Sequence, residues 1–362
     1  MFETETRAKI IERLREFYEK NKKTEASSVE GTFAFDTFAA NANEFEKTYA
    51  EMSLILDAAF PQTSWGKYLD YLAEELAGID RRKATPAVVT LTLKGSSGAT
   101  VPAGSLFSTQ SGVTFALDSD AIIKDGEAEA RATAQTPGKE GNVLPGSISK
   151  IPVTIYGISA VTNKEASYDG YDEETDSSLL ERLLFAVRQP ATSGNIYHYI
   201  EWATSVSGVG AVKVIPLWNG NGTVKVIAVD ANKDTPSEDL LENVRNVIKE
   251  NAPIGATVTV VAPTLKKIDI SLKITNGKGN EAAIKKVLTD YFKKNVFGTN
   301  YTRKETEKAF TVSYAQVGRT ILDNVEETGV LDYDDLKING DTKNISIPAD
   351  NMPVVGEVTL DA

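Results

Sequence analysis

Residues 38–60 read FAANANEFEKTYAEMSLILDAAF, and the apolar residues of this stretch organise the prediction for the whole chain. One set of them is spaced alternately four and three residues apart: Phe38, Ala42, Phe45, Tyr49, Met52, Leu56 and Ala59. This heptad spacing keeps apolar side chains on one face of a supercoiled helix. Two interpretations are open at this point. The helix packs on the core of its own chain, or it joins a bundle with helices of other chains.

Two further helices are expected beside this one. Residues 7–20 carry apolar side chains at helical spacing and end at an Asn-Lys-Lys sequence. After Pro61, Thr63 is expected to cap a third helix, and Gly78 stands just past its end. Residues 1–80 therefore predict a helical arm.

A small β-rich domain is expected from residue 81 to residue 165. Val89, Leu91 and Leu93 alternate with polar residues, which is the period of a half-buried strand. The sequence that follows consists of short apolar runs separated by Asp-Gly and Pro-Gly turns.

The remaining chain predicts two α+β sandwich-like domains, at 166–263 and 264–362. An acidic run from Glu165 to Asp176 precedes a helix, where acids favour the positive end of the helix dipole. The turn at residues 219–222 predicts a hairpin between strands 209–217 and 223–230. Thr235-Pro236-Ser237-Glu238 is interpreted as a capping box with Thr235 as the cap. The order helix, Gly, strand, Asn-Gly, strand occurs at 198–230 and again at 315–347, which suggests an internal duplication. The fold class is thus α+β and multidomain.

Composition excludes several classes of function. The 362 residues carry a net charge of −12 and a pI near 4.9, which argues against nucleic acid and anionic membranes as partners. There is no cysteine and therefore no disulfide or zinc thiolate site. No run is long and apolar enough for a membrane span, and Met1-Phe2-Glu3 does not begin a signal peptide. We expect assembly in the cytoplasm.

The residues of catalytic and metal sites are largely missing. His198 is the only histidine, so no Ser-His-Asp triad or histidine-rich metal site can be built around a second one. Asp230, Asn232 and Asp234 imitate a calcium loop, but Thr235 and Leu241 stand where Gly and Glu are required. We expect no enzyme activity, no cofactor and no metal. A glycan hydrolase or carbohydrate-binding module using Trp65, Trp202 and Trp218 is the alternative, and a scaffold with an unrelated partner is a third.

Several short motifs, in order, resemble the baseplate J-like family of contractile phage tails. In the β-rich domain these are Val101-Pro102-Ala103-Gly104-Ser105 and Gly141-Asn142-Val143, followed by the acidic entry Gly170-Tyr171-Asp172-Glu173-Glu174-Thr175-Asp176. The fullest match lies further on: Ser193-Gly194-Asn195, Tyr199, Trp202, Gly208-Val209, Val212-Lys213-Val214, Pro216, Gly222, and Pro253-Ile254-Gly255. These are packing and turn motifs.

The resemblance implies a structural role in the baseplate wedge of a phage tail or a phage-tail-like bacteriocin. Members of the family are similar to arms of a heterotrimer, in which two copies join one copy of a second wedge protein through a helical bundle. Other baseplate, sheath-initiating and hub proteins would be neighbours, and the C-terminal domains would pair between wedges. The resemblance also implies a relay of the contraction signal to the sheath and a place in the released particle. It favours the intermolecular interpretation of the heptad stretch.

Overall fold

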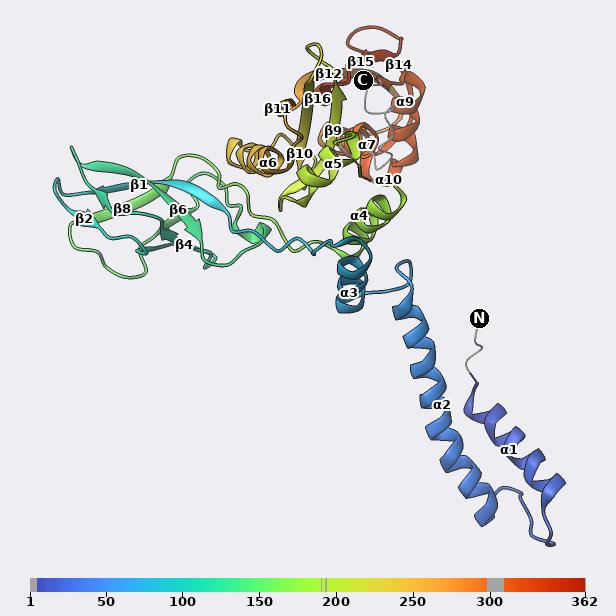
Figure 1. The fold of residues 1–362 in the computed structure, drawn as a ribbon. Helices are drawn as coiled ribbons and strands as arrows, with labels where there is room; N and C mark the ends of the chain where they lie inside the picture. Colours follow the sequence, from blue (N-terminus) through green and yellow to red (C-terminus); the bar gives the residue numbers. More distant parts are fainter. Residues whose placement is uncertain (1–4, 190, 193, 298–308, 362) are drawn as a thin grey trace. The chain divides into compact units, whose positions relative to one another are not determined.

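In the computed structural model, residues 5–189, 191–192, 194–297 and 309–361 are described. The chain divides into two compact units, Met1–Arg81 with Thr175–Val187, and Arg82–Glu174 with Arg188–Ala362. Helices, a barrel-like sheet and two smaller mixed sheets make up these units, so the α+β multidomain class is confirmed (Figure 1).

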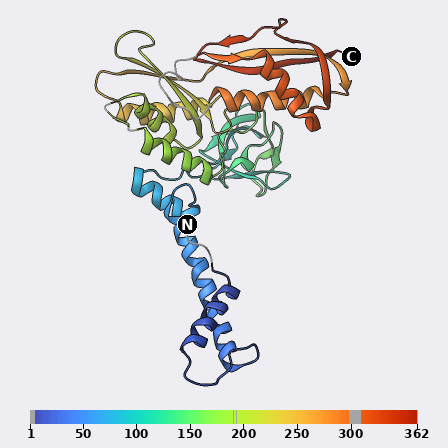
Figure 2. The same cartoon turned by 90° about the vertical axis from the view of Figure 1, so that its right-hand side faces the viewer.

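The first unit is helical and contains α1 (Arg7–Asn21), α2 (Phe33–Ala59), α3 (Gly66–Ala77) and α4 (Asp176–Arg188). Helix α1 packs along the N-terminal half of α2, where Ile10 and Ala42 are fully buried (Figures 1 and 2). Helix α3 packs on α4 through four buried side chains: Leu69, Ala73, Leu179 and Leu183. Helix α4, which was expected in the third domain, belongs to the same compact unit as the arm.

Both predicted helix caps are wrong by two residues. Helix α3 begins at Gly66, whose N–H donates to the Asp176 carboxylate at 3.0 Å, while Thr63 donates its hydroxyl to carbonyls at the end of α2. Helix α6 (Glu238–Asn251) is capped by Ser237, which accepts the Leu240 N–H at 3.0 Å. In both places a different acceptor reaches the first free N–H groups of the helix.

The second unit begins with a six-stranded antiparallel sheet in the order β7-β3-β4-β6-β1-β8. Its strands are β1 (Val88–Gly95), β3 (Leu106–Thr109), β4 (Thr114–Leu117), β6 (Glu127–Ala134), β7 (Ile148–Lys150) and β8 (Ile158–Asn163). A short pair, β2 (Thr100–Val101) and β5 (Ala121–Ile122), and the 3-10 helix η1 (Lys139–Gly141) lie in its connections. Asn163 joins the two edge strands, because its carbonyl accepts the Gly146 N–H and its side chain accepts the Ile148 N–H. The sheet is therefore a nearly closed barrel around the predicted inward residues of β1, Val89, Leu91 and Leu93.

The central part holds α5 (Ile196–Ser205), β9 (Val209–Pro216), β10 (Thr223–Asp230), α6 and β11 (Thr257–Val261). Strands β9 and β10 form the predicted antiparallel hairpin, and β10 pairs in parallel with β11 after the crossover through α6.

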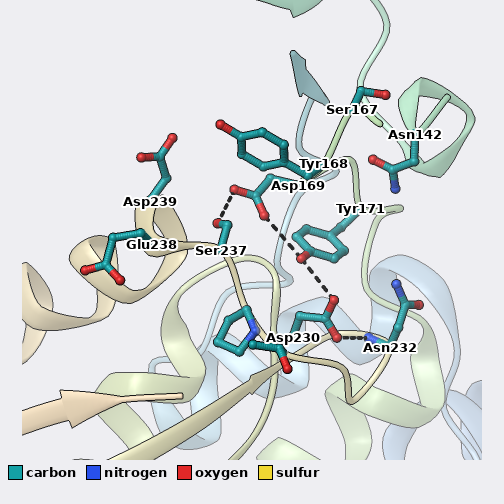
Figure 3. Close-up of a pocket in the computed structure, with 12 residues that line it drawn as sticks. Asn142, Ser167, Tyr168, Asp169, Tyr171, Asp230, Asn232, Ser237, Glu238 and Asp239 are labelled. Atoms are coloured by element: carbon teal, nitrogen blue, oxygen red, sulfur yellow. Dashed lines mark hydrogen bonds between the residues drawn. The ribbon is translucent and has the colours of Figure 1, made fainter. Parts of the chain in front are cut away.

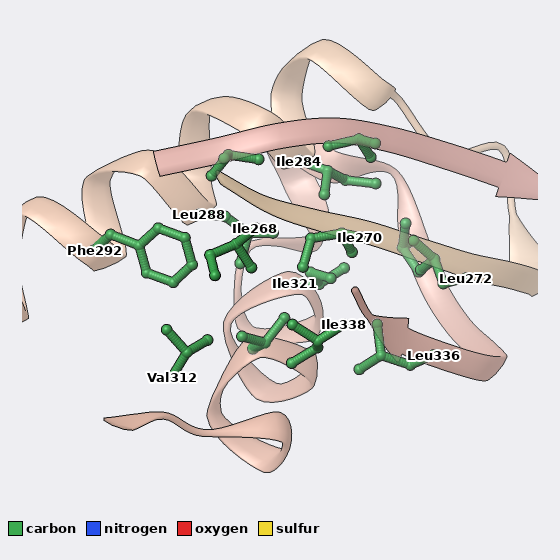
Figure 4. Close-up of a cluster of buried hydrophobic side chains, with 14 of the residues drawn as sticks. Ile268, Ile270, Leu272, Ile284, Leu288, Phe292, Val312, Ile321, Leu336 and Ile338 are labelled. Carbon is green, nitrogen blue, oxygen red and sulfur yellow. The ribbon is translucent and has the colours of Figure 1, made fainter. Parts of the chain in front are cut away.

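The C-terminal part places β12 (Thr264–Gly277) between β14 (Val330–Ile338) and β16 (Asn351–Asp361). The other elements are α7 (Glu281–Val296), β13 (Phe310–Val312), α9 (Tyr314–Asp323), α10 (Val325–Thr328) and β15 (Ile345–Ile347). Side chains of α7 and α9, including Ile284, Leu288 and Ile321, meet Ile268 and Ile270 of β12 in one apolar core (Figure 4).

The pairing of these strands does not support the suggested duplication. The first copy of the repeated pattern ends in the β9–β10 hairpin. In the second copy β14 pairs with β12, and β15 pairs with β13. The central sheet, β11-β10-β9, and the C-terminal sheet, β14-β12-β16, each contain one parallel and one antiparallel strand pair. The strands follow one another along the chain in a different order in the two sheets.

Candidate functional site

The surface of α2 is the candidate functional site, because its apolar side chains divide between two faces. At about 100° per residue, Phe38, Ala42 and Tyr49 lie on one face, and helix α1 covers it. The Tyr18 ring meets the Phe38 ring edge to face at 5.4 Å, and Arg13 donates to the Tyr49 hydroxyl at 3.4 Å. These three of the seven predicted heptad residues are therefore engaged within the chain.

A second face of α2 remains exposed, and we call it the free face. Phe45, Met52 and Ala59 of the predicted set belong to it, together with Thr48 and Ile55. These five residues are again spaced three and four apart. Phe45 is 49%, Met52 46% and Ile55 67% exposed. Leu56, at the uncovered end of the helix, is half-buried.

The free face belongs to a unit that is unusually rich in exposed apolar side chains. More than half of the large hydrophobic residues exposed in the described part of the chain lie in the helical unit, although it is the smaller of the two. Phe33, Phe60 and the α3 residues Tyr68 and Tyr71 are among them. Because large exposed apolar patches are typical of interaction sites, the helical unit carries the candidate interaction surface.

The acidic residues nearest the free face form a regular row. Glu44 and Glu51 are seven residues apart and follow the edge of the free face. Lys47 pairs with Glu44 at 2.8 Å on the outer side of the helix. In a helical bundle, charges in such flanking positions select the partner helix.

The predicted motif residues of the central part serve its packing. Tyr199 and Val209 are buried, and Trp202 stacks on His198 with ring centroids 4.8 Å apart. A side chain at Gly194 would collide with the Pro253 ring. The other motif residues lie at the ends of β9–β11 and in their turns: Gly208, Pro216, Gly222 and Gly255. Ser193 lies outside the described residues.

Gly208 shows why this motif needs glycine. Its φ is 94°, a left-handed conformation that side chains disfavour, and a Cβ there would lie 2.7 Å from Cε2 of Tyr171. Gly208 thus lets the buried Tyr171 ring approach the start of β9.

Tyr171 belongs to a polar cluster that sequence reasoning did not find. It lies in a hollow of about 510 Å³ with Asp169, Asp230 and Ser237 (Figure 3). Two of these acids had been considered as part of a helix entry and of a failed calcium loop. The contacts join residues about sixty positions apart, so no local pattern announces them.

The acidic run before α4 forms specific pairs. Glu174 is buried and binds the Arg82 guanidinium at 2.7 Å, and the same guanidinium donates to the carbonyls of Thr204 and Val209. Asp172 pairs with Lys139 at 2.9 Å. Among the described residues, no group of three or more His, Cys, Asp or Glu side chains is arranged to hold a metal ion.

The tryptophans of the glycan-binding alternative already have partners in the chain. Trp202 is stacked on His198, and the Trp218 ring lies under the Lys225 ammonium, whose nitrogen is 4.2 Å from the ring centroid. In the described part of the chain, no helix is both long and apolar enough to cross a bilayer.

Comparisons with known proteins agree with this architecture. Residues 89–170 match the Baseplate J-like protein barrel domain, and residues 191–262 match the Baseplate J-like central domain. The phage-like element PBSX protein XkdT of Bacillus subtilis is 32% identical over 373 residues, covering 99% of each chain. Baseplate protein gp47 of Escherichia phage Mu is 33% identical over 213 residues, covering 55% of this chain and 59% of gp47.

These matches define a class of protein built on a barrel domain followed by a central α+β domain. The chain belongs to the baseplate J-like family, and the resemblance found in the sequence is confirmed. A solved structure of the anti-feeding prophage baseplate is also similar, at 13% identity and a TM-score of 0.38, with 99% of this chain and 100% of that chain covered.

Proposed function

We propose that this chain is a non-enzymatic structural component of the baseplate wedge of a contractile injection machine, either a phage tail or a phage-tail-like bacteriocin. Membership of the baseplate J-like family and the name of the phage Mu relative support the baseplate role. The observation that carries the wedge assignment is the free face of α2. An apolar face of this length, uncovered in the isolated chain, is stabilised when a partner helix buries it.

The partner of the free face is a helix that differs from α2. If two α2 helices met antiparallel through their free faces, Glu44 of one would approach Glu51 of the other, and like charges repel. If they met parallel, Glu44 and Glu51 would face Tyr49 and Leu56, and no ion pair would form. A helix with an apolar seam and Lys or Arg at heptad spacing complements the face. A second wedge protein, bridging two copies of this chain, would supply it.

The other parts of the chain have roles that follow from the same proposal. The C-terminal α+β part, 264–362, would make the contact between wedges around the tail hub, and residues 81–165 and 166–263 would connect it to the arm. When receptor-binding fibres engage, the interfaces would change from one arrangement to another and pass the contraction signal to the sheath. The chain would be assembled in the bacterial cytoplasm and leave in the released particle.

Co-purification with the products of neighbouring tail genes tests the proposal. The wild-type chain is expected to bring down a second wedge protein in a defined ratio. Met52→Glu places a charge on the free face, where it would be desolvated in the bundle, and we expect at least a tenfold loss of the complex.

Leu54→Glu is the matched control. Leu54 is 53% exposed on the same helix but lies about 200° away from Met52 around the axis. It should leave the complex largely intact. A wild-type chain that stays alone beside its co-expressed neighbours would contradict the wedge role, and equal losses in the two variants would contradict the assignment of the free face.

A further inference from the structure

The polar cluster around Tyr171 connects the end of the barrel to the central sheet. The Tyr171 ring is only 9% exposed, and its hydroxyl oxygen lies 3.3 Å from Oδ2 of Asp230 and 3.4 Å from Oδ1 of Asp169. Figure 3 shows the hydroxyl between the two carboxyl groups. Asp230 ends β10, whereas Asp169 and Tyr171 lie in the segment that leaves the barrel.

Each carboxyl group has its other oxygen fixed by separate donors. Oδ1 of Asp230 accepts the backbone N–H groups of Asn232 at 2.9 Å and Asp234 at 2.7 Å. Oδ2 of Asp169 accepts the Ser237 hydroxyl at 2.5 Å. Both groups are therefore held with one remaining oxygen directed at Tyr171.

The number of hydrogens shared by the tyrosine hydroxyl and the two carboxyl groups decides how many of their contacts can be hydrogen bonds. A tyrosine hydroxyl has one hydrogen and can donate it to one carboxylate only. When both acids are ionised, the second oxygen faces a lone pair. When one acid is protonated, its O–H donates to the tyrosine oxygen and the tyrosine donates to the other acid, so both contacts become hydrogen bonds.

We propose that Asp169, Tyr171 and Asp230 form a proton-dependent clamp between the barrel and the central sheet, tight with one shared proton and weaker when both acids are ionised. The inference concerns the isolated chain and is independent of the proposed wedge role.

The surrounding charges leave this balance in place. Arg131 acts on Asp169 as a cation and is paired with Asp239 at 2.7 Å at the start of α6, and Lys233, in the turn after Asp230, donates its ammonium to the Phe297 carbonyl. Asp234 is paired with Lys293 of α7 at 2.6 Å. Other acids near the cluster are Glu165, Asp172 and Glu238, and Lys139 and Arg245 pair with the last two.

Burial and like charge favour the protonated form of the clamp. Burial is the main cause that raises the pKa of Asp169 and of Asp230, and the negative charges of Asp239 and Asp234 add to it. An acid whose folded pKa is raised binds its proton more tightly in the closed state. The clamp is then strongest below the ordinary pKa of aspartate and weakens as the pH rises through the raised pKa.

Hydrogen exchange of the backbone tests the clamp in the full chain. Peptides covering 165–174 and 228–240 are followed at about pH 5.5 and pH 8, with intrinsic exchange rates divided out. For wild type we expect opening to be slower at the lower pH, because the shared proton is lost as the pH rises through the raised pKa of the two acids. Asp230→Asn mimics the protonated acid, and it should open slowly at both pH values.

Asp169→Asn is the second clamp variant and should behave in the same way. Asp169 has a φ of 63°, which asparagine tolerates, so this variant keeps the backbone. Asp172→Asn is the control, because Asp172 is exposed and the contacts with Lys139 lower its pKa. The clamp is refuted if wild type exchanges alike at both pH values, if neither clamp variant slows opening at pH 8, or if Asp172→Asn slows it equally.

Discussion

Gly208 tests how the central part is packed, because Gly220, in the turn at the other end of β9, has nearly the same backbone conformation and serves as the reference. Gly208→Ala adds a Cβ at φ 94° that would lie 2.7 Å from Cε2 and 2.9 Å from Cδ2 of Tyr171. The ring cannot easily retreat, since it is buried and its backbone is bonded to Thr85 in both directions. Gly220→Ala adds the same methyl group at φ 95°, where nothing lies within 4 Å.

The difference between the two variants isolates the steric collision. A left-handed conformation costs a residue with a Cβ about 1–2 kcal/mol, and this applies to both. Overpacking a filled site adds about 1–3 kcal/mol at Gly208 only. We therefore expect Gly208→Ala to lower the free energy of unfolding by about 2–5 kcal/mol and Gly220→Ala by about 1–2 kcal/mol.

Urea unfolding followed by tryptophan fluorescence measures both, since Trp202 lies on α5 and Trp218 in the β9–β10 turn. Equal destabilisation by the two variants would show that backbone strain alone explains the glycine at 208. The reasoning about Tyr171 would then fail, whatever the size of the shared effect.

Three further predictions concern the same unit. Arg82→Met leaves the buried Glu174 carboxylate without its cation and should destabilise the chain by about 3–5 kcal/mol. Adding Glu174→Gln removes the unpaired charge and should restore much of this loss. A double variant whose destabilisation equals the sum of the two single effects would contradict the prediction. Burial lowers the pKa of Lys213 to about 8, so below that pH the buried ammonium destabilises the fold. Wild-type stability should rise with pH between about 8 and 10.5, because over this range the lysine is neutral in the folded chain and still charged in the unfolded chain. Lys213→Met should remove that rise and stabilise the chain at pH 7 by up to about 3 kcal/mol in a pH series of urea melts. Leu272→Ala should lower the free energy of unfolding by about 2–5 kcal/mol, measured by thermal unfolding. Leu331 is 60% exposed on the neighbouring strand, so Leu331→Ala should lower it by less than about 0.5 kcal/mol. Similar values for the two variants would mean that the core is wrongly assigned.

Local sequence signals predicted the elements whose ends are set locally. The β9–β10 hairpin came out within one residue, because its turn has Gly220 and Gly222 at positive φ and its flanking residues alternate. The predicted cap of α3 failed for the opposite reason. The acceptor for the Gly66 N–H comes from Asp176, more than a hundred residues away, and no local motif can report it.

The heptad stretch shows a different limit. Spacing alone found the helix, but it combined two of its faces into one, and the intermolecular role of the exposed face stays a prediction. Phe38 and Tyr49 contact α1, whereas Phe45 and Met52 are exposed. Ile55 was not predicted, and only the structure, in which α1 covers the other face, shows that it belongs to the free face. Amphipathic spacing predicts that a face will be covered, but it does not say by what.

The family matches cover only part of the chain. The matched ranges, 89–170 and 191–262, cover the barrel and the central sheet, and the motif glycines inside them shape turns and close packing. The free face of α2 lies outside both ranges. A scaffold can keep its barrel and central sheet through glycines such as Gly208 and Gly194, while the exposed residues of α2 change with the helix they meet. If the proposed wedge role holds, the residues that define the family and the residues that select the partner are different, and Glu44 and Glu51 belong to the second kind.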